Sequence, residues 1–216
     1  TFNNCGSSSI FERRNQPHER APLSALIRQA KQRPLGIILA AYGLTVVSFS
    51  MLTATYALFT ERRFGYTAAQ NGFLFAGQGL LGAIIQGGLL GRLVNAFGDK
   101  RLVIAGTLTF ALSLWLLPMS TTTSFLLFAT TGVAIGHSLV LAPLNGLASK
   151  SVKASSQGQV LGMMQSAASV ARIVGPVLGG WLLNYDALHA ADAFGRMPYS
   201  VGAVVALLAF ALALAL

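Results

Sequence analysis

The chain has 216 residues, of which 54% are hydrophobic and only 10% are charged, and its formal net charge is +9. Soluble domains carry about 25% charged residues, so this composition excludes an ordinary soluble domain and indicates an integral membrane protein. The single cysteine excludes an internal disulfide, and three scattered histidines predict no metal site.

Residues 1–33 differ in composition from the rest of the chain. They are polar and basic, and we expect them to form a cytoplasmic linker with a short amphipathic helix over Pro22–Arg33. No signal peptide is visible. Because the chain begins at Thr1 and ends in an apolar run at Leu216, we expect it to be a piece of a longer polytopic protein.

Residues 34–216 predict a six-helix transmembrane bundle, because a helix needs about 20 apolar residues to cross the bilayer. Alternating strands of about 10 residues, as in a membrane barrel, do not occur. The predicted fold class is therefore all-α integral membrane. The expected spans are roughly 35–59, 70–91, 102–117, 123–146, 158–183 and 199–216.

Most of the 15 basic residues fall on one side of this topology. They lie in the N-terminal segment and in the loops that follow the second and fourth spans. The positive-inside rule places these segments in the cytoplasm. We therefore attribute the net charge to topology and to anionic lipid, and not to nucleic acid.

A stripe of aromatic and hydroxyl side chains follows the first span at helical spacing, and it includes Tyr42, Phe49, Thr53 and Tyr56. Such a stripe is compatible with interhelical packing or with the wall of a wet cavity. The third and sixth spans hold few polar residues, and we expect them to face lipid. Glycines in the second, fourth and fifth spans predict close helix crossings.

Ionisable residues in the membrane are expensive and mark candidate sites. We expect the six carboxylates to lie in loops or tails, outside the spans. Arg172 is expected to face the bundle interior and to pair, either as a structural ion pair or in substrate binding or gating. His137 near the middle of the fourth span is either a hydrogen-bonded packing residue or a group that couples to protons.

The loop after the second span reads Gly91-Arg-Leu93-Val-Asn95-Ala-Phe-Gly98-Asp99-Lys100-Arg101. It resembles the signature loop of the major facilitator superfamily, G-x-L-a-D-R-x-G-R-K. Gly91, Leu93, Gly98 and Lys100 match that pattern. Asn95 replaces an aspartate and Asp99 replaces a base, as in the more degenerate copy carried by the second half of such proteins.

The fifth span resembles the antiporter motif of the drug/proton exchangers of that superfamily. Gly162, Gly175-Pro176 and Gly179-Gly180 match, and Ala171 replaces one glycine. A basic segment precedes the first span, and the fourth span lacks the Arg-x-x-Gln-Gly type of motif. The resemblance therefore implies the C-terminal six-helix half of a twelve-helix fold.

The resemblance implies a secondary transporter, and not an enzyme, that exports amphipathic or drug-like molecules by alternating access. The implied partners are the lipid bilayer, a small-molecule substrate and a missing N-terminal six-helix half. No cofactor is implied beyond a proton gradient, and the implied location is a cell membrane, taken as the bacterial inner membrane. The implied cavity residues are Tyr42, Phe49, Thr53, Tyr56, Gln78, His137, Asn145 and Gln165. The implied gating residues are Gly91, Asn95, Gly98, Asp99, Lys100, Arg101, Gly162, Arg172, Gly175, Pro176, Gly179 and Gly180.

Two alternatives share this fold. One is a uniporter or symporter for sugars or metabolites, which would lack the glycine-proline motif of the fifth span. The other is a transport-inactive membrane protein that only binds partners. An intramembrane protease is disfavoured, because Gly136-His137-Ser138 does not supply a buried nucleophile with a separate base.

Overall fold

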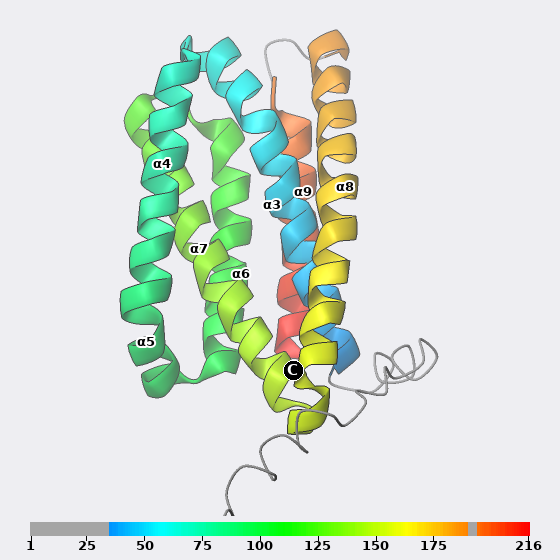
Figure 1. Cartoon of the computed structure of the whole chain (residues 1–216). Coiled ribbons are helices and arrows are strands. Elements are labelled where there is room, and N and C mark those ends of the chain that lie inside the picture. Colours follow the sequence, from blue (N-terminus) through cyan, green and yellow to red (C-terminus); the bar gives the residue numbers. More distant parts are fainter. Residues whose placement is uncertain (1–34, 190–193) are drawn as a thin grey trace, which may run out of the picture.

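The computed structural model describes residues 35–189 and 194–216, so the predicted linker and its amphipathic helix lie outside the described residues. Six helical segments are long and apolar enough to cross a membrane, which confirms the all-α, six-span fold class. They run side by side along one axis (Figure 1). The elements are α3 (Leu35–Phe64), α4 (Ala68–Ile84), a π-helical segment (Ile85–Leu89), α5 (Leu90–Phe97), α6 (Asp99–Leu116), a 3-10 turn (Leu117–Met119), α7 (Thr123–Lys150), a 3-10 turn (Ala154–Ser156), α8 (Gln157–His189) and α9 (Arg196–Leu214).

Local sequence signals fix where several helices begin and end. Thr67 and Gln70 form a reciprocal capping box at the start of α4, in which each side chain accepts a hydrogen bond from the other residue's backbone N–H. Gly98 separates α5 from α6 with a φ of +81°, a conformation that favours glycine. The start of α4 and the boundary between α5 and α6 are therefore set by local sequence.

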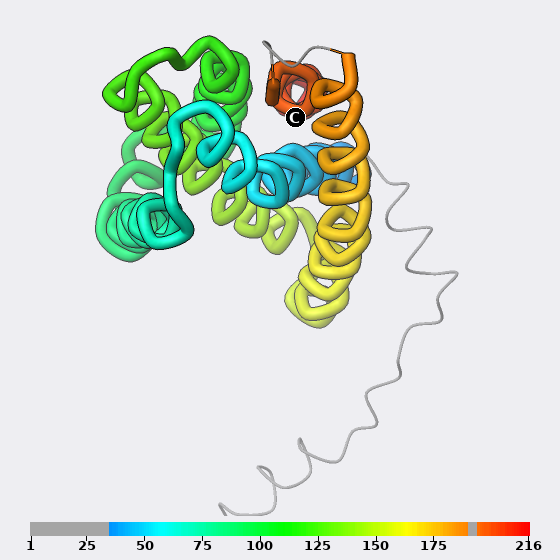
Figure 2. Tube along the Cα trace, turned by 90° about the horizontal axis from the view of Figure 1, so that it is seen from above, coloured from blue at the N-terminus to red at the C-terminus, as the bar shows by residue number. Residues whose placement is uncertain are grey.

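The helix α3 occupies the centre of the bundle. It packs against α8, α9 and α7, while α6 packs against α7 and α9. Viewed from above, α3 lies between α4 on one side and α8 on the other (Figure 2). In the most apolar window of each span, 56% of the residues of α3 are buried, against 6% in the span that contains α4. The two core clusters accordingly form around α3, and α4 contributes little to them.

Two helix crossings depend on the absence of a side chain. A Cβ atom added at Gly175 on α8 would lie 2.5 Å from Cβ of Ser50 on α3. One added at Gly136 on α7 would lie 2.5 Å from the backbone nitrogen of Phe110 on α6. These contacts are the close crossings expected of small residues in membrane helices. In contrast, Gly72 has no atom within 4 Å of its Cβ position, and Gly79 and Gly87 are the same, so these glycines of the second span do not serve packing within this bundle.

The third and sixth spans were expected to face lipid, and that expectation is wrong for much of their surface. Half of the most apolar window of α6 is buried, and 39% of that of α9. The buried residues of these helices include Phe110, Leu114 and Tyr199. The physical reason is that lipid and a protein core are equally apolar, so low polarity alone does not separate the two environments.

Candidate functional site

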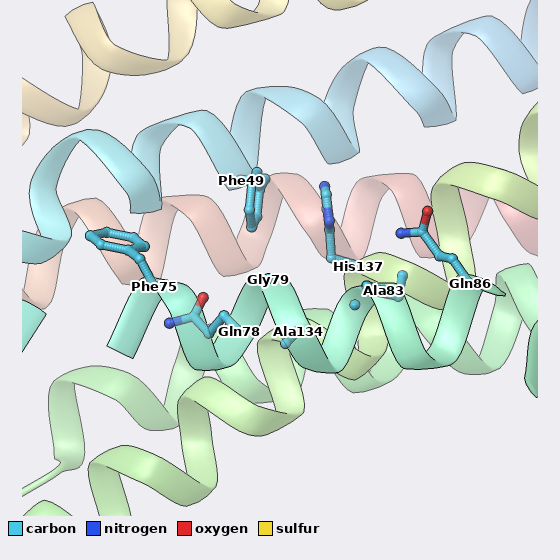
Figure 3. Close-up of a pocket in the computed structure, with 10 residues that line it drawn as sticks. Phe49, Phe75, Gln78, Gly79, Ala83, Gln86, Ala134 and His137 are labelled. Atoms are coloured by element: carbon cyan, nitrogen blue, oxygen red, sulfur yellow. The ribbon is translucent and has the colours of Figure 1, made fainter. Parts of the chain in front are cut away.

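A cavity of about 400 Å³ lies between α3, α4 and α7. Its lining comes mainly from one face of α4 and of the π-helical segment that follows, opposite residues of α3 and α7 (Figure 3). The lining residues are Phe49, Phe75, Gln78, Gly79, Gly82, Ala83, Gln86, Ala134, His137 and Ser138. A volume of this size is within the range of small-molecule sites.

Aromatic rings form one wall of this cavity. The rings of Phe49 and His137 are stacked, with centroids 3.8 Å apart and planes 16° from parallel. Phe110 approaches the same imidazole at 5.9 Å, tilted by 48°. Within residues 35–189 and 194–216, His137 makes no hydrogen bond to a side chain or backbone group, so its contacts here are aromatic packing.

The polar groups of the cavity are neutral. Gln78 and Gln86 contribute side-chain amides from two turns of the second span, and Ser138 contributes a hydroxyl from α7. Gln86 belongs to the π-helical segment Ile85–Leu89, and such wide turns occur frequently at functional sites. None of the described residues that line the cavity is charged. The site can therefore form hydrogen bonds and stacking contacts, without an ion pair of its own.

A second cavity of about 270 Å³ continues along the groove between α4 and α7. It is lined by Phe73, Leu74, Gly77, Gln78, Leu81, Leu127, Thr130 and Thr131. Gln78 lines both cavities, so its side chain lies at the boundary between them.

The structure brings together three of the eight residues implied for the cavity, namely Phe49, Gln78 and His137. Tyr42 and Tyr56 do not line it, because both are buried in the core with exposures of 3% and 1%. The remaining three also lie apart from it: Thr53 and Gln165 are exposed, and Asn145 is half-buried. The aromatic and hydroxyl stripe of the first span is thus divided among core packing, the cavity wall and the exposed surface.

Sequence reasoning missed Phe75 and Gln86 as lining residues. A signal for them exists in the second span, because Phe75, Gln78, Gly82 and Gln86 recur at steps of three and four residues. This spacing places them on one helical face. The pattern is weak, because the glycines in this span reduce the difference in hydrophobicity between the two faces of the helix.

The signature-like loop is fixed by an ion pair. Asp99 at the first position of α6 pairs with Lys150 at the end of α7. Its carboxylate also lies beside Gly146, whose Cβ position is 3.6 Å from Oδ1. The other gating residues implied for this loop are exposed, and none of them forms an ion pair with a described residue. They are Gly91, Asn95, Gly98, Lys100 and Arg101.

The fifth span presents its motif on two faces. Gly175 and Gly179 are buried against α3, where their Cβ positions approach Ser50 and Met51. The other motif positions, Gly162, Pro176 and Gly180, are exposed, and α8 continues as one helix through Pro176. Only the motif residues on the buried face, Gly175 and Gly179, therefore form the close crossing of α8 on α3.

Arg172 does not face the interior of this bundle as predicted. It lies on the exposed face of α8, and among the described residues it makes no hydrogen bond or ion pair. The reason is the helical register, because the buried positions of α8 are those that align with Gly175 and Gly179.

The described carboxylates were expected in loops, and that expectation is wrong, because Glu61, Asp99 and Asp186 all lie within the end turns of helices. Asp186 belongs to the last turns of α8 and is 1% exposed, so it is not a loop residue. One oxygen of its side chain accepts a hydrogen bond from the backbone N–H of Met197 at 2.9 Å. This bond ties the end of α8 to the start of α9. No group of three or more metal-binding side chains occurs in the described part of the chain.

Comparisons with known proteins bear on this geometry. Residues 38–216 match the family model described as Major Facilitator Superfamily. The class D tetracycline resistance protein of Salmonella ordonez is 26% identical over 152 residues, which are 70% of this chain and 38% of that protein. Multidrug resistance protein 2 of Bacillus subtilis is 26% identical over 198 residues, which are 90% of this chain and 49% of that protein. Solute carrier family 22 member 18 of Mus musculus is 30% identical over 166 residues, covering 76% of this chain and 38% of that protein.

The crystal structure of the human organic anion transporter MFSD10 (TETRAN) has the same fold. It superposes with a TM-score of 0.74 at 22% identity, covering 89% of this chain and 46% of that one. The chain therefore spans about half of this structure, and between about a third and a half of the length of the curated relatives.

Proposed function

Because this chain belongs to the major facilitator superfamily, we propose that it forms the C-terminal half of a proton-coupled exporter of amphipathic, drug-like molecules. Several relatives are tetracycline or multidrug resistance proteins, and this supports the proposed class of substrate. We propose that residues 1–33 connect this bundle to a preceding six-helix half. The chain is a multi-pass membrane protein, and its proposed location is the bacterial inner membrane.

The observation that carries the proposal is the lining of the cavity between α3, α4 and α7. It combines the stacked pair of Phe49 and His137 with the amides of Gln78 and Gln86, and no charged side chain among the described residues lines it. Aromatic faces favour flat organic molecules, and a few amides can orient such a molecule by hydrogen bonds. A sugar site would need a denser set of polar side chains.

A proton carrier is not part of this cavity. Among the described carboxylates, Asp99 is paired with Lys150, Asp186 holds the N–H of Met197, and Glu61 lies in the last turn of α3. Intramembrane carboxylates are the usual proton relays of transporters. We therefore place the proton-binding carboxylate in the proposed N-terminal half.

We place the proposed N-terminal half against the exposed face of α8. Arg172 lies on this face in the middle of an apolar helix, and it needs a partner from outside the bundle. The opposite face of α8 is held tightly on α3 by Gly175 and Gly179. In this proposal α3 and α8 move as one rigid unit against the other half, and Arg172 makes one of the contacts that change.

The test is efflux of tetracycline and ethidium by the full-length protein in everted membrane vesicles. We expect Phe49→Ala to lower the rate threefold to tenfold, the range of one lost aromatic contact. The matched control is Phe128→Ala, because Phe128 is 67% exposed and does not line the cavity. Efflux should stop when the pH gradient is collapsed.

The other outcomes separate the alternatives. Transport that is independent of the pH gradient would favour a uniporter of the same fold. Absence of transport for drugs, sugars and metabolites alike would favour the transport-inactive binding protein. Equal effects of Phe49→Ala and Phe128→Ala would remove the cavity from the proposal.

A further inference from the structure

A third cavity, of about 230 Å³, lies at the end of the bundle where the chain of α7 ends and that of α6 begins. Its lining comes from four parts of the chain. These are the first turn of α3, the first turn of α6, the C-terminal end of α7 and the residues after α9. The lining residues are Ile38, Lys100, Leu147, Lys150, Ser151 and Leu216. This end is the lower one in Figure 1, and its cavity shares no lining residue with the cavity of the proposed function.

The polar part of this lining is cationic. Lys100 and Lys150 contribute two ammonium groups, and Ser151 contributes a hydroxyl. Asp99 pairs with Lys150 and neutralises one positive charge. Within the described residues Asp99 is the only acidic side chain of the loops at this end, so the cavity keeps a net positive charge.

The surroundings reinforce this charge. Arg92, Arg101 and Lys153 are exposed at the same end of the bundle and do not line the cavity. Clusters of basic residues at the end of membrane helices attract anionic lipid, with each residue contributing a similar increment. The field around the cavity therefore favours an anion over a neutral molecule.

The rest of the lining is apolar. Ile38 belongs to a core cluster, Leu147 and Leu216 pack against that cluster, and all three line the cavity. A free phosphate ion would gain nothing from such a wall, whereas the glycerol and first methylenes of a lipid would be removed from water there. The cavity therefore has a polar part, formed by two lysines and a serine, and an apolar part formed by aliphatic side chains.

We propose that this cavity binds an anionic phospholipid, with its phosphate between Lys100 and Lys150 and its glycerol against Ile38 and Leu147. Ammonium groups form short, charge-assisted hydrogen bonds to phosphate oxygens, and the Ser151 hydroxyl can donate one more. The site lies outside the transport cavity, and it does not rest on the proposed function.

The experiment is a titration of the purified full-length protein with dioleoyl phosphatidylglycerol, with retained lipid counted by native mass spectrometry. We expect Lys100→Gln and Lys150→Gln each to weaken binding about fivefold. The matched control is Lys153→Gln, which removes the same charge at the same end but does not touch the cavity. An equal effect of Lys153→Gln would overturn the site, because binding would then follow net charge alone.

A second variant separates binding from structure. Asp99→Asn breaks the ion pair but leaves both lysines, so phosphatidylglycerol binding should be unchanged or tighter. If Asp99→Asn weakens binding as much as Lys150→Gln, the effect of Lys150 is structural and the proposal fails. Ser151→Asp, at an exposed position, should weaken binding as strongly as the lysine variants, and an unaltered affinity would also contradict the site.

The lipid assignment has its own test. Dioleoyl phosphatidylcholine should bind at least fivefold more weakly than phosphatidylglycerol, since its choline opposes the two lysines. Inorganic phosphate should not displace phosphatidylglycerol at millimolar concentration. Displacement by phosphate, or equal binding of both lipids, would overturn the anionic phospholipid as the occupant.

Discussion

The close crossing of α8 on α3 can be tested by adding a single methyl group. In Gly175→Ala the new Cβ would lie 2.5 Å from Cβ of Ser50 and 2.8 Å from the carbonyl oxygen of Val47. Relaxed carbon–carbon contacts are about 3.5–4.0 Å, so the two helices must separate by about 1 Å. Overpacking of this kind costs about 1–3 kcal/mol of unfolding free energy.

The matched control is Gly180→Ala on the same helix, because no atom lies within 4 Å of the Cβ position of Gly180. Alanine is a better helix former than glycine by about 0.5–1 kcal/mol, and this gain applies to both variants. Their difference therefore isolates the crossing. Thermal unfolding of the full-length protein in detergent should give a lower midpoint for Gly175→Ala, with Gly180→Ala equal to the parent or above it.

A rescue variant makes the test sharper. Adding Ser50→Gly to Gly175→Ala removes the 2.5 Å contact but leaves the carbonyl oxygen of Val47 in place, so it should restore part of the lost stability. Coupling of this size is expected for residues in direct contact. Equal midpoints for Gly175→Ala and Gly180→Ala would refute the tight crossing and, with it, the rigid unit of α3 and α8.

Three further predictions concern the cavity and the loop. His137→Phe keeps the aromatic stack, so efflux should persist. Loss of proton-coupled efflux with normal expression would show that the imidazole itself is needed. Asp99→Lys should lower the free energy of unfolding by at most about 1 kcal/mol, and with it the thermal midpoint, since the ion pair is partly exposed. Combining Asp99→Lys with Lys150→Asp should restore the midpoint, and no recovery would argue against a simple ion pair. In a chain whose native cysteine is replaced by serine, Thr53→Cys should react with a hydrophilic thiol reagent faster than Tyr42→Cys, because only position 53 is exposed; the reverse order would contradict the register of α3.

The sequence was sufficient for the fold class. Each membrane span must satisfy its own backbone hydrogen bonds, so an apolar run of sufficient length specifies a helix without knowledge of its neighbours. Turn signals acted locally as well, as at Gly98 and at the capping box of Thr67 and Gln70. The two short motifs sufficed to indicate the family, because they combine residue types at fixed spacing within single segments.

The tertiary structure alone decided which face of each helix is used. In α3 the same polar and aromatic stripe divides into buried Tyr42, cavity-lining Phe49 and exposed Thr53, although all three residues share one spacing pattern. In α8 the register that buries Gly175 leaves Arg172 exposed. A helical pattern gives a direction relative to the helix axis, whereas burial depends on which neighbour lies in that direction. In a membrane, lipid and protein core are both apolar, and only the packing of the helices distinguishes them.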